Sequence, residues 1–400
     1  MANVSSSNGL EKRPKLRFPG FDEPYRTITL GQIASLVNRT DPTSNAPIMM
    51  LSAGNGFIMQ SEKYSRDNAG QSLKKYILLK KGELAYNHGA SKAKQYGCCY
   101  ELTEDEARIP YVYHCFKVSG AEHTPYVATA LNNPKIDRQL KRLVSSSVRM
   151  DGLLNISFDD YMSVILHLPS LKEQTHIADF LKKLDERITA QEKLVASLKK
   201  YKRGLLMHYF SDDNTLQWKQ YTISQIGKVI TGSTPPTNDR SNYDGDLLFC
   251  SPGDIGDQKY ISSTEKRVSP KGFALGRVIP PSSVIVTCIG LIGKLGIATT
   301  DMITNQQINA LIVSEDFDNE FIYYAFENFF PKYRSKVSMQ TLPILSKSEF
   351  ERLLIKVPNL NVQHKISNYL AGMDKRIEHT QQELNMLQEL RRGIIQKLFI

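Results

Sequence analysis

The chain contains 400 residues, more than a single hydrophobic core usually organises, so two or more domains are expected. Its composition, 41% hydrophobic and 23% charged residues, is that of a globular protein. No apolar run reaches the roughly 18–20 residues that a membrane span requires. A net charge of +10 favours a polyanionic partner, with nucleic acid as the leading candidate.

The N-terminal sequence and the cysteines indicate the compartment. Residues 1–15 contain no apolar segment of the kind found in secretory signals. The five cysteines form no CxxC pair and are odd in number. We therefore expect a cytoplasmic protein with reduced thiols and no membrane partner.

The first globular unit is expected at residues 18–168, after an N-terminal tail of residues 1–17. Its middle, residues 77–102, consists of short β-branched and aromatic runs separated by Gly, Ser and Asn, which is typical of strands and loops. The second unit, expected at residues 211–357, has a middle of the same character at residues 278–312. The expected fold class of both units is α+β.

A long helix is predicted in the central helical spacer region, residues 169–210. Apolar residues recur there at alternating steps of four and three, or at multiples of seven, which is the pattern of a coiled-coil seam. Pro169 suits the start of this helix, because the residue before a proline avoids the helical region. The helix should run for about 38 residues, on the order of 57 Å at ~1.5 Å per residue. The seam residues are Ile177, Leu181, Leu184, Ile188, Val195 and Leu198.

A second copy of this helix is predicted in the C-terminal helical spacer region, residues 358–400. The two copies match at a constant offset of 189 residues without a gap, from Pro169 and Pro358 to Phe210 and Phe399. The match indicates an internal duplication. The second seam consists of Ile366, Leu370, Met373, Ile377, Leu384 and Leu387.

We expect the two helices to pair as an antiparallel coiled coil. A helix of this length with one apolar stripe pairs with another long helix more often than it lies within one core. Polar residues interrupt the seams at equivalent places, Gln191/Thr380 and Lys202/Arg391, where they can fix register and partner choice. A pseudo-twofold repeat would place the two units at opposite ends of a rod. The alternative is that each helix is only a buried element of its own domain.

The globular units are duplicated at their edges. Residues 27–45 align with residues 220–238, and residues 147–157 align with residues 336–346. The two middles share little sequence. Similar edges with different middles predict one duplicated scaffold that carries two different surfaces.

Motifs for catalysis are missing from the sequence. There is no GxxxxGK[ST] phosphate loop, no HExxH or Cys/His zinc spacing, and no [DNS]PP[YFW] motif for amino-methylation of a base. The "GLIGKLG" at residues 290–296 lacks the context of a dinucleotide-binding fingerprint. We expect no catalytic residues and no metal site in this chain.

The repeated helices carry the features of a known family. Both copies read P-x-L-x-x-Q-x-x-I-x-x-x-L-x-x-x-D-x-R-I and end in [KR]-R-G-[LI]-[LI]-x-x-x-F. The sequences "LRFPGF" at residues 16–21 and "TNQQINAL" at residues 304–311 add to the match. With these features the chain resembles, over nearly its whole length, the specificity (S) subunit of Type I restriction–modification systems.

The resemblance implies a DNA-reading adaptor that has no catalytic activity by itself. Two target recognition domains would each read one half of an asymmetric, bipartite site in double-stranded DNA. The two helical regions would separate these domains and dock two methyltransferase subunits, through which restriction subunits would join the complex. Partner subunits would hold S-adenosylmethionine for methyl transfer to adenine, and ATP and Mg for cleavage.

Candidate DNA contacts are polar residues in loop-like stretches of both units. Arg and Lys suit guanine edges and phosphates, whereas Asn and Gln suit adenine edges, although an exposed loop lysine can also be merely solvated. The candidates in the first unit are Arg39, Asn87, His88, Ser91, Lys92, Lys94 and Arg149. Those in the second unit are Thr234, Arg240, Lys294, Asn305, Gln306 and Gln307.

Two other interpretations stay open on the sequence alone. A coiled-coil scaffold that joins two protein-binding heads, without nucleic acid, would have the same helices. A fragment of a fused restriction–modification enzyme would lack the same motifs, although the complete pair of repeats argues against truncation. Steeply salt-dependent binding to duplex DNA would favour the DNA-reading adaptor over the scaffold.

Overall fold

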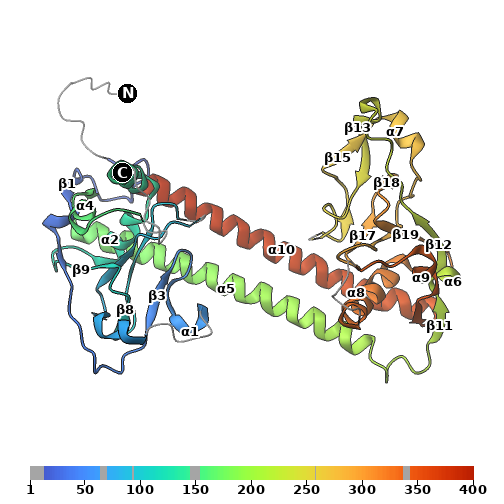
Figure 1. Cartoon of the computed structure of the whole chain (residues 1–400), viewed down its shortest axis with the longest axis horizontal. Helices are drawn as coiled ribbons and strands as arrows, with labels where there is room; N and C mark the ends of the chain where they lie inside the picture. Colours follow the sequence, from blue (N-terminus) through green and yellow to red (C-terminus); the bar gives the residue numbers. More distant parts are fainter. Residues whose placement is uncertain (1–12, 64–69, 92–93, 145–153, 257, 337–342) are drawn as a thin grey trace. The chain divides into compact units, whose positions relative to one another are not determined.

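The computed structural model describes residues 13–63, 70–91, 94–144, 154–256, 258–336 and 343–400 (Figure 1). The chain forms two compact units: unit 1 comprises residues 1–190 and 384–400, and unit 2 comprises residues 191–383. The division falls within two long helices, α5 (Leu171–Tyr209) and α10 (Leu360–Leu398), so each unit contains a part of both. Each helix has 39 residues and starts two residues after its proline, which confirms the predicted helices.

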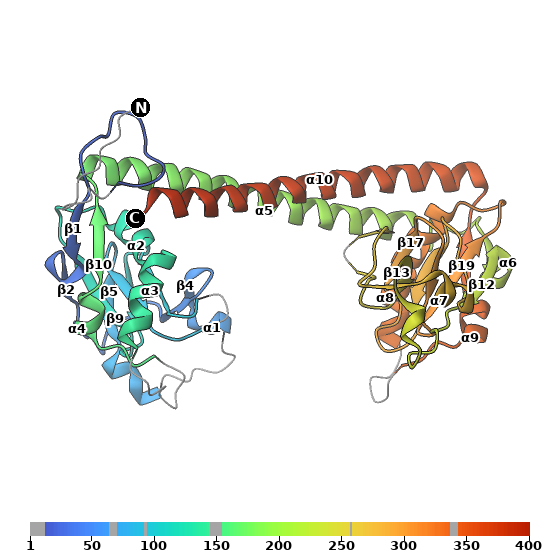
Figure 2. The same cartoon turned by 90° about the horizontal axis from the view of Figure 1, so that it is seen from above.

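Unit 1 is built around a four-stranded antiparallel sheet in the order β2-β9-β6-β7 (Figure 2). Helix α2 (Thr124–Leu131) packs on this sheet, and its Tyr126 and Val127 are buried in one core with Leu84 and Phe116. Strand pairs β3–β4 and β5–β8 form a second core, and β1 pairs with β10 just before α5. The strands are β1 (Arg26–Thr29), β2 (Ala34–Leu36), β3 (Met49–Ser52), β4 (Gly56–Met59), β5 (Ile77–Lys80), β6 (Leu84–Asn87), β7 (Cys98–Glu101), β8 (Glu106–Ile109), β9 (His114–Val118) and β10 (Ile165–Leu168), and the further helices are η1 (Leu30–Gln32), α1 (Gln60–Lys63), η2 (Gly70–Lys75), α3 (Pro134–Leu143) and α4 (Phe158–Met162).

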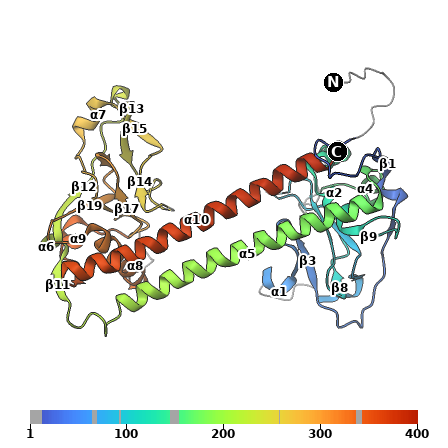
Figure 3. The ribbon, with the colours of Figure 1, turned by 180° about the vertical axis from the view of Figure 1, so that it is seen from behind.

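Unit 2 contains a five-stranded sheet in the order β12-β19-β16-β17-β14 and a three-stranded sheet in the order β15-β13-β18 (Figure 3). Helix α8 (Asn319–Lys336) packs on the larger sheet, and its Phe321 and Phe326 are buried in one core with Val286 and Leu370. Strand β11 pairs with β20 just before α10. The strands are β11 (Lys219–Thr222), β12 (Gly227–Thr231), β13 (Tyr243–Cys250), β14 (Tyr260–Ile261), β15 (Lys266–Val268), β16 (Val284–Thr287), β17 (Leu295–Ala298), β18 (Met302–Thr304), β19 (Ile308–Val313) and β20 (Leu354–Val357), and the further helices are α6 (Ile223–Ile226), η3 (Arg240–Asn242), α7 (Pro270–Leu275) and α9 (Lys347–Arg352).

Both units follow one plan, although their middles share little sequence. The order β2-β9-β6-β7 in unit 1 corresponds to β12-β19-β16-β17 in unit 2, and all of these neighbours pair antiparallel. The predicted α+β scaffold and its internal repeat are therefore confirmed, and the repeat extends through the middles. Helix-capping boxes recur at matching places, namely Thr29–Gln32 and Ser157–Asp160 in unit 1, and Thr222–Gln225 and Ser346–Glu349 in unit 2.

A glutamine at the start of each long helix joins it to its own unit. Gln174 donates through Nε2 to the carbonyl oxygen of the proline five residues before it (3.0 Å), and its Oε1 accepts from the backbone N–H of His123 (3.0 Å) beside α2. Its repeat partner Gln363 donates to its own preceding proline (2.9 Å) and accepts from the N–H of Asp318 (2.9 Å) beside α8. Because both amides are buried, each satisfies backbone groups that would otherwise be costly to bury.

The two long helices pair antiparallel within each unit. In unit 1, the guanidinium of Arg391 on α10 forms an ion pair with Asp185 on α5. In unit 2, Lys202 Nζ on α5 lies 2.7 Å from Asp374 Oδ1 on α10. These ion pairs are equivalent under the 189-residue repeat, so the polar seam positions found in the sequence form matching pairs.

The hydrophobic seam lies between the same helices. The predicted seam residues are all buried or half-buried. The first part of each helix also belongs to a globular core, through Ile177 and Leu181 in unit 1 and through Ile366 and Leu370 in unit 2. Each long helix therefore both pairs with the other long helix and is partly buried in a globular core, so the two expectations are compatible.

The cysteines are structural. All five thiols are free and buried, and burial raises the pKa of the Cys98 thiol to about 11, so it stays protonated at neutral pH. Within the described part of the chain, no helix combines the length and apolar character needed to cross a membrane.

Candidate nucleic-acid interface

In unit 2, four loops meet at one end of the two sheets. They are residues 232–236 after β12, 251–256 after β13, 288–294 between β16 and β17, and 305–307 before β19, and we call them the loop edge of unit 2. Three backbone hydrogen bonds join them to one another or to strand ends: Gly232 N–H to Ile308 O (3.0 Å), Cys288 N–H to Gln307 O (2.8 Å) and Asn305 N–H to Cys250 O (3.0 Å).

Amide and hydroxyl side chains gather on this loop edge. The Thr234 hydroxyl donates to Gln306 Oε1 (2.6 Å), and both residues are exposed. Asn305 Nδ2 donates to Gln307 Oε1 (3.1 Å), while Asn305 Oδ1 accepts from the Gln307 backbone N–H (3.1 Å). The approach of the loops is close, because a Cβ at Gly232 would collide with the carbonyl oxygen of Asn305. The structure thus brings together four of the residues that the sequence singled out.

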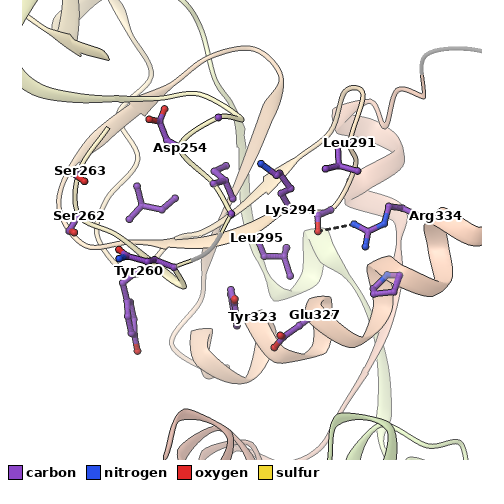
Figure 4. A pocket seen from close by; sticks show the side chains of 17 residues that line it. Asp254, Tyr260, Ser262, Ser263, Leu291, Lys294, Leu295, Tyr323, Glu327 and Arg334 are labelled. Carbon is purple, nitrogen blue, oxygen red and sulfur yellow. Dashed lines mark hydrogen bonds between the residues drawn. The ribbon is translucent and has the colours of Figure 1, made fainter. Parts of the chain in front are cut away.

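Lys294 belongs to the 288–294 loop, which bonds to the cluster through Cys288, and it lines a hollow of about 910 Å³ (Figure 4). Its Nζ donates to the carbonyl oxygen of Pro252 (3.1 Å). Arg334 of α8 also lines the hollow, and its Nη1 donates to the carbonyl oxygen of Ile292 (2.8 Å) in the turn that carries Lys294. The hollow thus combines two cations, whose hydrogen bonds go to backbone carbonyl oxygens, with the carboxylates of Asp254 and Glu327.

Arg240, the remaining candidate of unit 2, is exposed at the start of η3. This turn is fastened to the 232–236 loop, because the Tyr243 hydroxyl donates to the carbonyl oxygen of Pro235 (2.6 Å) and Asn242 Nδ2 donates to that of Pro236 (3.1 Å). Arg334 was not found from the sequence, because it lies some 40 residues away from Ile292 and Lys294 and nothing local marks it.

The β16–β17 turn holds its shape through one threonine. The Thr287 hydroxyl donates to the carbonyl oxygen of Leu291 (2.5 Å) and accepts from the Lys294 backbone N–H (2.9 Å). Gly293 adopts a left-handed φ of 78° and packs against the ring of Phe330. The tip residue Leu291 is 59% exposed. A rigid turn therefore presents its tip and Lys294 at fixed positions.

The corresponding loop edge of unit 1 consists of residues 37–41 after β2, 88–91 and 94–97 between β6 and β7, and 110–113 between β8 and β9. The Val37 N–H donates to the carbonyl oxygen of Cys115 (2.8 Å). In unit 2 the matching position lies within the paired strands β12 and β19. Gly97, like Gly293, adopts a left-handed φ, here 83°, in the turn between the two matching strands.

The candidate residues of unit 1 have differing environments. Ser91 is exposed, and its Oγ accepts from the Lys94 backbone N–H (3.0 Å). Lys94 Nζ donates to the carbonyl oxygen of Asn132 (2.9 Å), and half-buried Asn87 accepts through Oδ1 from the Gly89 N–H (2.9 Å). Lys92 and Arg149 lie outside the described residues.

Two further candidates of unit 1 are engaged inside the fold. His88 is only 4% exposed and packs edge-on against the His114 ring (4.9 Å between centroids), so its imidazole does not reach the surface. Burial lowers the pKa of neighbouring His114, which favours the neutral form of that ring. The Arg39 guanidinium donates to both oxygens of buried Glu83 (2.8 and 3.0 Å), so its charge is largely balanced.

A charged network connects α8 to the helix pair in unit 2. Lys202 Nζ lies 2.8 Å from Glu327 Oε2 as well as 2.7 Å from Asp374 Oδ1, and the Tyr324 hydroxyl donates to Asp374 (2.6 Å). Burial raises the pKa of Glu327, and Lys202 opposes this rise. Glu327 also lines the hollow, so the helix pair supports the wall of the candidate interface. Among the described residues, no group of His, Cys, Asp or Glu side chains could hold a metal ion.

Comparisons with known proteins give a consistent result. Residues 216–389 match the family described as "Type I restriction modification DNA specificity domain". The chain is 28% identical over 189 residues to the Type I restriction enzyme MjaIX specificity subunit of Methanocaldococcus jannaschii, and 25% identical over 186 residues to the HindI specificity subunit of Haemophilus influenzae. These matches cover 46% and 45% of this chain and 44% and 40% of the relatives, so the chain spans less than half of the length of either relative.

Solved structures share the fold over almost the full length. The S subunit of a Type I restriction–modification system from M. genitalium aligns with a TM-score of 0.60 at 15% identity, covering 97% of this chain and 99% of that one. A chain from a study of complex assembly and conformational transition of the type I R-M system aligns with a TM-score of 0.58 at 17% identity, covering 96% and 98%. At these identities the likeness shows the fold alone.

Proposed function

We propose that the chain is a Type I specificity subunit that reads DNA for a Type I restriction–modification complex, and the match of residues 216–389 to the family described as "Type I restriction modification DNA specificity domain" supports this. The observation that carries the proposal is the loop edge of unit 2, where Thr234, Asn305, Gln306 and Gln307 gather on loops of the same edge as Lys294. Amide groups suit base edges and cations suit phosphates.

The target is a bipartite, asymmetric site in double-stranded DNA, of which each unit reads one half. Two units with one fold but different loop residues are suited to reading two different sequences. In this assignment residues 18–168 and 211–357 are the target recognition domains, and residues 169–210 and 358–400 are the helical spacer regions. The exposed polar residues of both loop edges contact bases or phosphates, whereas His88 and Arg39 support the loops from within.

The chain acts as an adaptor for partner enzymes in the cytoplasm. Two methyltransferase subunits dock on it, and restriction subunits join through them. S-adenosylmethionine, ATP and Mg act in those partners, and the chain itself contributes recognition and not turnover. The net charge of +10 supports a polyanionic partner for the assembly.

Salt dependence of DNA binding tests this proposal. The purified chain should bind duplex DNA with an affinity that falls steeply as salt rises, because phosphate contacts release counterions. Lys294→Ala should reduce the slope of log affinity against log salt by about 1. Lys219→Ala is the matched control, since Lys219 is exposed on β11 outside the loop edge, and it should leave the slope unchanged. A chain that binds no duplex DNA at low salt would instead favour the protein-binding scaffold.

A further inference from the structure

The repeat allows residues of the two loop edges to be matched one by one. In unit 1, β2 and β9 pair with Leu36 opposite Phe116, and in unit 2, β12 and β19 pair with Val229 opposite Leu311. These registers match when Ile33 of unit 1 is placed on Ile226 of unit 2, as the sequence alignment of the edges requires. The residue just before β9 then corresponds to the first residue of β19.

The turn that precedes these strands is closed by the same backbone hydrogen bond in both units. The Tyr113 N–H donates to the carbonyl oxygen of Pro110 (3.0 Å), and the Ile308 N–H donates to that of Asn305 (3.2 Å). Each bond spans three residues, the first in the turn between β8 and β9 and the second in the turn between β18 and β19. Pro-Tyr-Val at 110–112 therefore occupies the place of Asn-Gln-Gln at 305–307, and Tyr111 occupies the place of Gln306.

Tyr111 is exposed to solvent in the turn before β9. Tyr111 is 51% exposed, whereas the nearby Tyr113 is 7% exposed. The Lys75 ammonium lies 5.8 Å from the centroid of the Tyr111 ring. The Tyr111 ring is exposed on a short, hydrogen-bonded turn, and a cation lies beside it. Such a surface suits a polyanionic ligand that also presents a flat or apolar group.

Building on the proposed function, we propose that residues 110–112 and 305–307 are equivalent reading loops and that Tyr111 is a base contact for the first half-site. The two loops use different chemistry. Gln306, held by Thr234, can hydrogen-bond to a base edge, and this suits adenine. Tyr111 has no amide; its ring makes apolar contact with a thymine methyl group, and Lys75 beside it contacts a neighbouring phosphate.

The test is selection of bound duplexes from a pool with randomised half-sites, using the full-length chain. Tyr111→Ala should flatten the preference at a thymine-containing pair of one half-site by roughly tenfold, the discrimination that one good base contact provides. Tyr111→Phe, which keeps the ring, should retain the preference. Gln306→Ala should flatten a position in the other half-site only.

A loop exchange strengthens the same test. Replacing residues 110–112 with Asn-Gln-Gln (P110N/Y111Q/V112Q) should change the selected bases in the first half-site and leave the second unchanged. If the native chain selects a bipartite site and Tyr111→Ala retains every preference, or alters both halves, this inference is wrong while the proposed function stands. If the native chain selects no sequence at all, the proposed function itself fails.

Discussion

Replacing Lys202 with methionine should lower the free energy of unfolding of unit 2 by about 3 kcal/mol at neutral pH. The ammonium is 11% exposed and lies between Glu327 and Asp374. Methionine fills similar space but leaves two partly buried carboxylates without their cation, and this uncompensated charge is the source of the loss. The sole tryptophan, Trp218, packs against Phe210 and Phe321 in the unit 2 core, so urea unfolding followed by its fluorescence measures the effect.

The internal repeat provides a matched control, Arg391→Met. Arg391 is the repeat partner of Lys202, but it is 35% exposed and pairs with a single carboxylate, Asp185, that is 46% exposed. The expected loss is about 1 kcal/mol or less, because solvated ion pairs contribute little. Equal losses for the two variants would contradict the assignment of Lys202 as the centre of a buried network.

The effect of Lys202→Met should also depend on pH. Burial already raises the pKa of Glu327, so the folded state binds its proton more tightly than the unfolded state and stability falls as pH rises through this range. Removing Lys202 raises that pKa further. The part of the destabilisation that comes from Glu327 should therefore be smaller near pH 4, where the folded state holds that carboxyl largely protonated, than near pH 7.5. A loss that does not change with pH would show that packing and not charge is responsible.

Gly293→Ala should destabilise unit 2 by roughly 2–5 kcal/mol, the sum of a left-handed backbone penalty and an overpacked contact. Gly293 has a φ of 78°, and an added Cβ would collide with the Phe330 ring. Gly97→Ala should have a similar effect in unit 1, where the Cβ would meet the carbonyl oxygen of Asn87.

Gly20→Ala separates the two terms of that estimate. Gly20 has a φ of 86° but nothing within 4 Å of an added Cβ, so only the backbone penalty of about 1 kcal/mol should appear. Urea unfolding of the three variants, followed by Trp218 fluorescence for Gly293→Ala and by circular dichroism for all, measures the differences. If Gly293→Ala is no worse than Gly20→Ala, the turn is not packed as described.

The long helices could be predicted from the sequence because their signal is repeated and periodic. A seam that recurs at an offset of 189 residues fixes both helices, and the structure starts them at Leu171 and Leu360 as the prolines suggest. The polar seam positions were recognised as well. Their partners, Asp185 and Asp374, follow once the helices run antiparallel, because the same repeat supplies both members of each ion pair.

The loop edges could be predicted only in part. Thr234 and Gln306 are 72 residues apart in the chain, and their contact depends on the register of β12 and β19, which short strands do not reveal. His88 looked like a loop residue because it lies between Asn87 and Gly89, yet the chain stays in the core at this point. Tyr111 has no polar pattern around it, and only its match to Gln306 identifies it as a candidate.

The similarity of the two middles was hidden from the sequence for a related reason. Antiparallel pairing needs only alternating burial and correctly placed turns, so Leu84–Asn87 and Val284–Thr287 can form the same strand with almost no identical residues. Positive φ at Gly82 and Ser282, just before these strands, marks the same turn in different residue types. The two units therefore share a fold because their turns and strand registers agree, although their residues differ.

Sequencing of DNA methylation in cells that carry this chain together with its matching methyltransferase subunits, compared with cells that lack its gene, tests the central claim most directly. We expect one new methylated motif with two unlike half-sites separated by unread base pairs, lost when the gene is deleted. A single continuous palindromic motif, or a methylation pattern that does not depend on this gene, would contradict it.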